Sequence, residues 1–298
     1  MWAEAVVLTV ITAATPLLLS SLGELVTERS GVLNLGVEGM MAVGAVTAFV
    51  TAVGTGSATL GVIVGPLAGA ALSLVFAFLT ITLATNQVAT GLALTLFGLG
   101  LSGVIGTSYV GIGLSPLPRL DLPGLRDLPF VGRVIFGQDA LVYLSIALTA
   151  AVWWFLNRSR AGLKLRAVGD SHVSAHALGL GVARVRYLAV MFGGAYLSLA
   201  YTPLWVENMT AGRGWIALAL VVFATWMPWR LLAGAYLFGA ITILQFHAQG
   251  FGIGLPSQLM SSLPYLATIL ALVIISRGSR HGLRNTPLSL GKSFVPDR

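Results

Sequence analysis

The side chains that could bind a ligand or do chemistry are concentrated in a few short stretches of this sequence. Asn34 and Glu38 are four residues apart, which places them on one face of a helix, just before a stretch without any charge. An ionisable side chain at membrane depth normally faces the interior of a helix bundle and is a candidate for function. The pair could contact a solute in a pathway, or it could bond neighbouring helix ends and hold a broken helix together.

A second polar group follows further along the chain and consists of Glu207, Asn208, Thr210 and Arg213. Glycines on both sides of the arginine let the backbone bend and present the guanidinium group. Such donors and acceptors could bind a sugar hydroxyl or the edge of a nucleobase. Equally, Glu207 and Arg213 could pair with each other and cap a re-entrant element.

Several kinds of catalytic site are excluded by residues that are missing. The chain has no cysteine, which removes disulfides, thiol catalysis and iron–sulfur clusters. His172 and His176 have the spacing of metal ligands, but no glutamate follows His172 and no third ligand is evident. The stretch 290–293 resembles the end of a phosphate-binding loop, yet Thr286 stands where that loop requires glycine. We therefore expect no cofactor on this chain.

The elements that position these residues must be membrane helices. Of the 298 residues, 56% are hydrophobic and only 9% are charged, whereas a soluble domain carries about 25% charged residues. The formal net charge of +7 is distributed between long uncharged stretches. That pattern favours positively charged cytoplasmic loops over a nucleic-acid surface, so we expect the lipid bilayer and no nucleic acid as a partner.

Intervals without charge mark where helices can cross a bilayer, which needs about 20 helical residues. They predict an all-α membrane protein, a polytopic bundle of about nine transmembrane helices. The interval 214–229 is short, so this segment is expected to be tilted, broken or re-entrant. The predicted spans are 5–23, one beginning near Val32, 59–83, 88–108, 140–157, 187–206, 214–229 and two within 231–276.

Basic residues set the expected orientation. Residues 158–186 and 277–298 are each rich in Lys and Arg and poor in acids, which predicts that both are cytoplasmic. Counting helices from these segments places the N-terminus outside and the C-terminus inside. The chain is thus expected to have a transmembrane domain at 1–276, with a cytoplasmic loop at 157–186, and a basic cytoplasmic tail at 277–298.

The cytoplasmic loop contains the pattern of a short capped helix. Asp170 or Ser171 can cap its N-terminus, and Gly179 suits the position after its C-terminus. Val173 and Ala177 share one face, with Leu178 beside it. Such a helix could dock into a cleft on a soluble partner, or it could lie on anionic lipid.

An ordered set of motifs resembles the permease subunits of ABC importers of the branched-chain amino acid and simple-sugar group. The form Glu28-Arg29-Ser30-Gly31 followed by Asn-Leu-Gly-x-Glu-Gly is most similar to the nucleoside permeases that work with basic-membrane-protein-type binding lipoproteins. The resemblance covers nearly the whole chain, and its motifs lie at 31–41, 86–94, 137–144, 162–179, 209–219 and 263–266.

The resemblance implies a non-catalytic subunit of the bacterial plasma (inner) membrane that forms a translocation pathway for nucleosides. The implied partners are a second, related permease subunit, a cytoplasmic ABC ATPase that binds ATP and Mg, and an extracytoplasmic substrate-binding lipoprotein. It also implies that the loop helix is the coupling helix that docks on the ATPase. The implied coupling residues are Arg166, Gly169, Asp170, Ser171, Val173, Ala175, Ala177, Leu178 and Gly179.

The chain departs from the family pattern at Thr95, where an Asn is expected, and Thr95 joins the candidate pathway residues. Tyr196–Tyr201 is also bulkier than the small residues expected there. Riboflavin and simple sugars therefore stay open as substrates of the same machinery. Two other classes are less supported: a stand-alone secondary transporter, which should show repeated coupling-site acids, and an intramembrane enzyme, which needs a nucleophile with a base or a metal set.

Overall fold

The computed structural model describes residues 2–114, 131–197, 205–206, 209–250 and 285–295, with scattered positions between 259 and 273. Over these residues the chain is helical and forms no β-strand. The helices are α1 (Trp2–Arg29), α2 (Val37–Thr55), α3 (Ala58–Ala77) with the π-turn η1 (Phe78–Thr82), α4 (Gln87–Gly106) with η2 (Thr107–Tyr109), α5 (Val131–Phe136), α6 (Ala140–Arg158), α7 (Arg160–Asp170), α8 (His172–Ala177), α9 (Val182–Leu197), α10 (Arg213–Phe223) and α11 (Pro228–Gly250).

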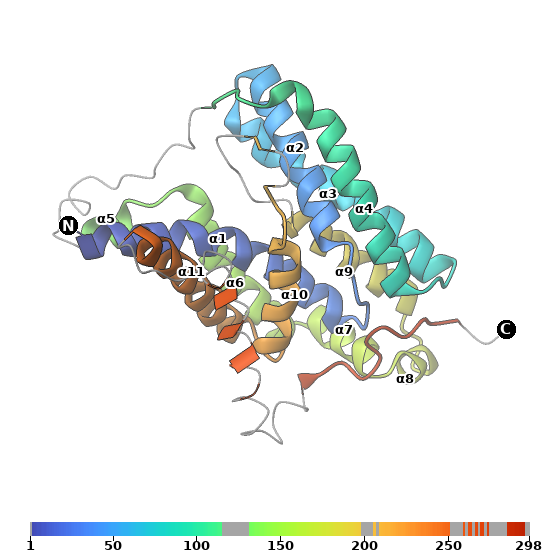
Figure 1. Cartoon of the computed structure of the whole chain (residues 1–298). Helices are drawn as coiled ribbons and strands as arrows, with labels where there is room; N and C mark the ends of the chain where they lie inside the picture. Colours follow the sequence, from blue (N-terminus) through green and yellow to red (C-terminus); the bar gives the residue numbers. More distant parts are fainter. Residues whose placement is uncertain are drawn as a thin grey trace.

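The helices form two groups that share α1 (Figure 1). One group packs α6, α10 and α11 against α1, with Leu18, Leu22 and Leu231 in its core. The other packs α2, α3, α4 and α9 together around residues such as Met40 and Phe76. Because α1 also contacts α9, the second half of α1 is enclosed from several sides and is the most buried part of the described bundle.

Polar side chains set the points at which helices begin. Ser57, Asn86 and Asp139 each accept a hydrogen bond from the backbone N–H three residues ahead, which satisfies one of the free donors of the first turn. The starts predicted for the spans 59–83 and 88–108 are therefore confirmed to within one residue: α3 begins at Ala58 and α4 at Gln87.

Glycine allows the close helix contacts that membrane bundles use in place of a hydrophobic driving force. A Cβ built at Gly98 on α4 would lie 2.6 Å from the Cα of Gly39 on α2. A Cβ at Gly39 would in turn meet the carbonyl oxygen of Leu94 at 2.6 Å. Neither position has room for a side chain, so the α2–α4 crossing depends on both glycines.

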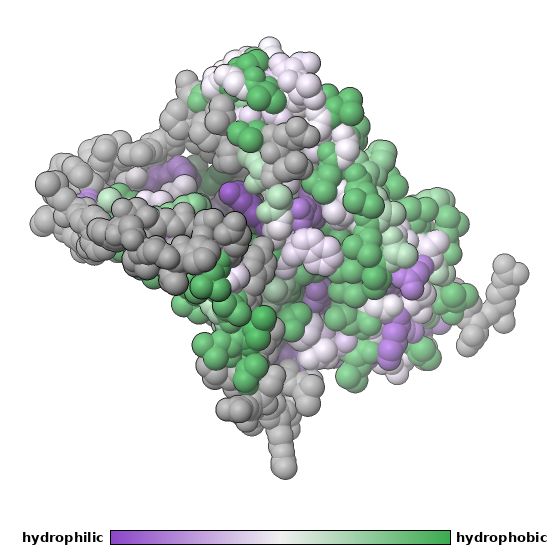
Figure 2. Space-filling model, in the orientation of Figure 1, coloured by the Kyte–Doolittle hydropathy of each residue, from purple (hydrophilic) through white to green (hydrophobic). Residues whose placement is uncertain are grey.

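Six helices of the described part are long and apolar enough to cross a membrane: Glu4–Arg29, Val37–Thr55, Ala58–Thr82, Gln87–Tyr109, Ala140–Arg158 and Pro228–His247. Large apolar side chains cover the outer faces of α3 and α4 (Figure 2), as expected for surfaces in contact with lipid. The nine-helix count and the orientation of the termini stay predictions. The segment expected after residue 256 lies largely outside the described residues.

Two boundaries differ from the prediction for a physical reason. Helix α1 continues to Arg29 rather than ending at residue 23, because Glu24 and Glu28 are buried within the protein instead of lying in water. Helix α2 begins at Val37, not near Val32, because side-chain oxygens accept hydrogen bonds from the backbone N–H groups of the residues just before Val37. The predicted short interval is α10, whose 11 residues span ~16 Å, well under the ~30 Å of a bilayer core.

Candidate functional site

Glu38 joins the N-terminal ends of two helices, α2 and α10. Its Oε1 accepts a hydrogen bond of 3.0 Å from the backbone N–H of Gly212, the residue that caps α10. The contact is close because Gly214 has no side chain: a Cβ there would lie 2.6 Å from the Cβ of Glu38. A carboxylate is favoured at helix N-termini, where the backbone dipoles leave partial positive charge. The second oxygen, Oε2, is buried without a partner among the described residues.

Asn34 and Thr95 hold the connection between α1 and α2. The Oδ1 of Asn34 accepts from Gly36 N at 2.9 Å, and the Oγ1 of Thr95 on α4 donates to the carbonyl of Leu35 at 2.8 Å. Asn34 is fully buried, and Glu38 and Thr95 are each only 7% exposed. Within one subunit these groups thus bond neighbouring backbone, as the helix-holding interpretation of the Asn34–Glu38 pair requires. Their contact with a solute stays a prediction.

Arg213 is the exposed basic side chain at the start of α10. Thr210 is buried before it and accepts, through its carbonyl, a hydrogen bond of 2.9 Å from Arg213 N. Gly212 between them has a positive φ of 77°, a conformation that glycine adopts without strain. Glu207 and Asn208 lie outside the described residues, so their predicted pairing or pathway role is not tested.

Two buried carboxyl groups on α1 were not singled out from the sequence. Glu24 and Glu28 are at most 1% exposed. Glu24 Oε1 accepts from Asn34 N at 3.3 Å, and Glu28 Oε2 accepts from Trp226 Nε1 at 2.6 Å. Their spacing of four residues, on the face that turns toward the bundle, is the sequence signal that could have found them. The sequence analysis ended the first span at residue 23, because it assumed that charged residues lie in water. Both carboxyl groups were therefore expected outside the membrane.

The loop predicted to be cytoplasmic folds as two short helices, which we call together with their flanks the coupling segment (residues 159–186). The predicted capped helix is present as α8: Ser171 Oγ accepts from Ser174 N at 3.2 Å, and Gly179 has a φ of +78°. Leu180 N then bonds the carbonyl of Ala175 at 3.0 Å and closes the C-terminal end. Asp170 is not the cap but the last residue of α7, a helix that the sequence analysis did not predict.

Apolar side chains of the coupling segment are exposed. Leu178 is 80% exposed and Val173 is 65% exposed, whereas Ala175 on the opposite side of α8 is 2% exposed and packs with Val168 and Val182. Ala177, Asp170 and Gly179 are also at the surface, and Arg166 is partly buried. Val173 on α8 and Leu178, the residue that caps its C-terminal end, are therefore apolar side chains directed away from the protein. Such side chains mark interaction sites with protein or membrane when they lie together.

Residues 285–295, which we call the C-terminal strap, pack on the coupling segment (Figure 1). Ser289 N donates to the carbonyl of Gly169 at 2.8 Å, and Ser289 Oγ accepts from His172 N at 3.3 Å. The ring of Phe294 meets the rings of His172 and His176 edge-on at 5.3 Å. The described part of the predicted tail thus contacts α7 and α8 of the coupling segment.

Burial lowers the pKa of His172 below its usual value, and the neighbouring positive charges of Arg186 and Lys292 act in the same direction. The Nδ1 of His172 lies 3.4 Å from Nη2 of Arg186. A neutral imidazole beside a guanidinium therefore forms part of the contact between the coupling segment and the strap.

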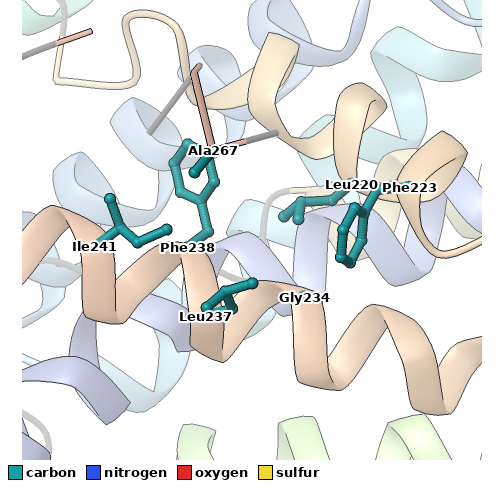
Figure 3. A pocket seen from close by; sticks show the side chains of 7 residues that line it. All are labelled: Leu220, Phe223, Gly234, Leu237, Phe238, Ile241 and Ala267. Atoms are coloured by element: carbon teal, nitrogen blue, oxygen red, sulfur yellow. The ribbon is translucent and has the colours of Figure 1, made fainter. Parts of the chain in front are cut away.

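The pocket between α10 and α11 has no polar side chain suited to a nucleoside or sugar (Figure 3). Its lining residues are Leu220, Phe223, Gly234, Leu237, Phe238, Ile241 and Ala267. In the part of the chain that is described, no three His, Cys, Asp or Glu side chains come together as a metal site. Neither feature is suited to binding a polar solute among the described residues.

Comparison with known proteins gives a match over nearly the whole chain. Residues 6–275 match the family of the permease component of branched-chain amino acid transport systems. No solved structure matches the chain.

Three relatives of known sequence cover most of this chain. A Haloferax volcanii protein named "Putative glucose ABC transporter permease protein" is 46% identical, covering 87% of this chain and 88% of its own. A guanosine ABC transporter permease of Bacillus subtilis is 32% identical, covering 94% of each chain. A nucleoside ABC transporter permease of Lactococcus lactis subsp. cremoris is 31% identical, covering 88% of this chain and 89% of its own.

Proposed function

The chain belongs to the permease family of branched-chain amino acid transport systems and is a permease subunit of an ABC transporter, and on this premise we propose that it forms part of the pathway for ATP-driven uptake of nucleosides. Family membership and the apolar helices are consistent with a multi-pass protein of the bacterial inner membrane. The observation that carries the proposal is the similarity, over 94% of each chain, to a guanosine permease.

Glucose or another simple sugar is the second candidate substrate. It is favoured by the 46% identity to the Haloferax volcanii relative, whose name gives glucose. A nucleoside and a sugar share a ring with several hydroxyl groups, which hydrogen-bond donors and acceptors such as Arg213 and Thr210 can bind. The same residues therefore serve either substrate in this proposal.

The coupling segment is proposed as the docking site of the cytoplasmic ATPase. Support comes from α8, a capped helix whose apolar side chains Val173 and Leu178 are exposed. Capping at both ends keeps six residues helical, which propensity alone would not. The residues that the resemblance implied for coupling, Arg166 to Gly179, all lie in α7, α8 and the turns that bound them.

The proposed transporter contains two permease subunits, the second being a related chain, with two ATPase domains and a substrate-binding lipoprotein outside. ATP and Mg bind to the ATPase, and this chain supplies no catalytic group. In such an assembly the solute crosses between the two permeases, so Glu38, Thr95 and Arg213 would act from this side of the pathway.

A competition experiment tests the substrate. Cells that express the partner genes, with and without this chain, take up radiolabelled guanosine in the presence of unlabelled nucleosides, glucose, ribose or riboflavin. We expect uptake that requires the chain and is inhibited by nucleosides. Chain-dependent uptake of radiolabelled glucose or ribose, without uptake of guanosine, would replace the nucleoside by a sugar. Chain-dependent uptake of riboflavin alone would reject both candidates.

A further inference from the structure

The short helix α10 is fastened at both of its ends, by different carboxyl groups. At its start, Gly212 N bonds Glu38 Oε1 at 3.0 Å. Beyond its last residue, the ring nitrogen of Trp226 bonds Glu28 Oε2 at 2.6 Å, and both residues are buried. Helix α10 therefore cannot move along its axis without moving Glu38 on α2 or the turn that contains Trp226.

The turn after α10, residues 224–227, has an unusual backbone. Thr225 and Trp226 have φ values of +50° and +54°, in the left-handed region that side chains other than glycine rarely adopt. A β-branched residue such as Thr225 is the least suited to it. A conformation of this kind persists only where its surroundings hold it, and such positions concentrate in segments that switch.

Arg29, at the end of α1, holds this turn and reaches the cytoplasmic side as well. Its Nη2 donates to the carbonyl of Trp226 at 3.1 Å, and its Nη1 donates to the carbonyl of Asn285 in the C-terminal strap at 2.9 Å. Its own carbonyl lies against Gly169 of α7, where no Cβ would fit. One residue thus contacts the turn after α10, the strap and the coupling segment.

The guanidinium group is suited to this role because of its shape. It is a planar fork with donors in fixed directions, so it can bind two carbonyl groups at once and keep their separation constant. A lysine ammonium has the same charge but no fixed fork, and it would bind the two carbonyls less rigidly. Binding of both carbonyl groups by Arg29 therefore depends on the geometry of the guanidinium group, not on its charge alone.

We propose that Arg29 is a positioning residue that links the coupling segment and strap to the turn after α10, so that displacement of the coupling segment by the ATPase moves α10 and its contact with Glu38. This inference rests on the proposed function, in which the ATPase docks on the coupling segment. Movement of the coupling segment would then be transmitted to the junction of α2 and α10 through contacts of Arg29 with Gly169, Asn285 and Trp226.

The test compares Arg29→Gln and Arg29→Lys with Arg230→Gln. Arg230 is the matched control because its Nη1 also bonds this turn, at Thr225 Oγ1 and 2.8 Å, but from α11 rather than from the cytoplasmic side. Each variant is assembled with its ATPase, permease partner and binding protein in proteoliposomes. ATP hydrolysed and radiolabelled guanosine or glucose taken up are measured in the same sample.

Both Arg29 variants are expected to assemble and hydrolyse ATP while using about tenfold more ATP per solute, within the range of typical coupling effects. Arg230→Gln is expected to keep the wild-type ratio. Three results would overturn the inference. These are full rescue by Arg29→Lys, an unchanged ratio of ATP to solute in Arg29→Gln, and a loss of uptake and hydrolysis in proportion to lost assembly. If wild-type uptake were independent of ATP, the proposed function itself would fail instead.

A second measurement reads the movement of α10 directly. Since the chain has no cysteine, Trp215→Cys, at a side chain that is 45% exposed on α10, gives this subunit a single thiol. We expect its rate of labelling by a membrane-impermeant maleimide to change when the ATPase is trapped with ATP and vanadate. The change in labelling rate should disappear with Arg29→Gln and persist with Arg230→Gln. If the change persists in both variants, the inference is overturned, even if the Arg29 variant folds poorly.

Discussion

Replacing Leu178 by alanine should weaken binding of the ATPase without unfolding the permease. The side chain is 80% exposed on α8, and burial of each CH₂ group contributes about 0.8 kcal/mol. Removing three carbons from a side chain exposed to that extent therefore costs about 2 kcal/mol of docking energy, or roughly 25-fold in affinity. Because an exposed side chain contributes little to folding, the free energy of unfolding of the permease should change by no more than about 0.5 kcal/mol.

The assay is titration of the detergent-solubilised permease complex with its ATPase subunit, followed by co-elution. Leu96→Ala is the matched control, because Leu96 is 73% exposed but lies on the membrane-spanning α4. The docking assignment would be refuted if Leu178→Ala bound the ATPase as tightly as the wild type. It would also be refuted if Leu96→Ala weakened binding to the same extent.

Two further changes test the packing of the coupling segment. Gly169→Ala forces a Cβ into the carbonyl at the end of α1 and should cost about 1–3 kcal/mol of stability. Gly181→Ala should cost little, because its Cβ would meet its nearest atom at 3.7 Å. Thermal unfolding in detergent compares the two variants. Burial and the charges of Arg186 and Lys292 lower the pKa of His172, so the unfolded chain binds its proton more readily. Stability should then fall as the pH drops below about 6.5, and His172→Gln should flatten that slope; equal slopes in both proteins would contradict this account.

Local signals in the sequence were sufficient where the determinants are local. The predicted spans 59–83 and 88–108 begin just after the caps Ser57 and Asn86, because a cap needs only its own side chain and the next N–H groups. The α8 helix was predicted for the same reason, from Ser171 and Gly179. The short uncharged interval after Arg213 predicted a tilted, broken or re-entrant segment, and the helix there is 11 residues long.

Determinants distant in sequence could not be predicted from one chain. Charge counting assumes that ionised groups lie in water, but Glu28 is bonded by Trp226, a residue 198 positions away, and is buried. The bond from Gly212 to Glu38 spans 174 positions. Helix α7 was missed because its amphipathic pattern is short and lies within a basic loop. The packing of the strap was missed because its contacts are mostly with backbone carbonyls, which leave no residue pattern.

An ABC permease differs from a transporter that works alone in that its uptake depends on the partner ATPase. Radiolabelled guanosine and glucose uptake would be measured in cells that carry this chain and its partners, with the ATPase either intact or with its phosphate-binding lysine replaced. We expect uptake to require both this chain and the intact ATPase. Uptake that needs this chain but persists with the disabled ATPase would contradict this expectation and would identify a transporter that works without ATP hydrolysis.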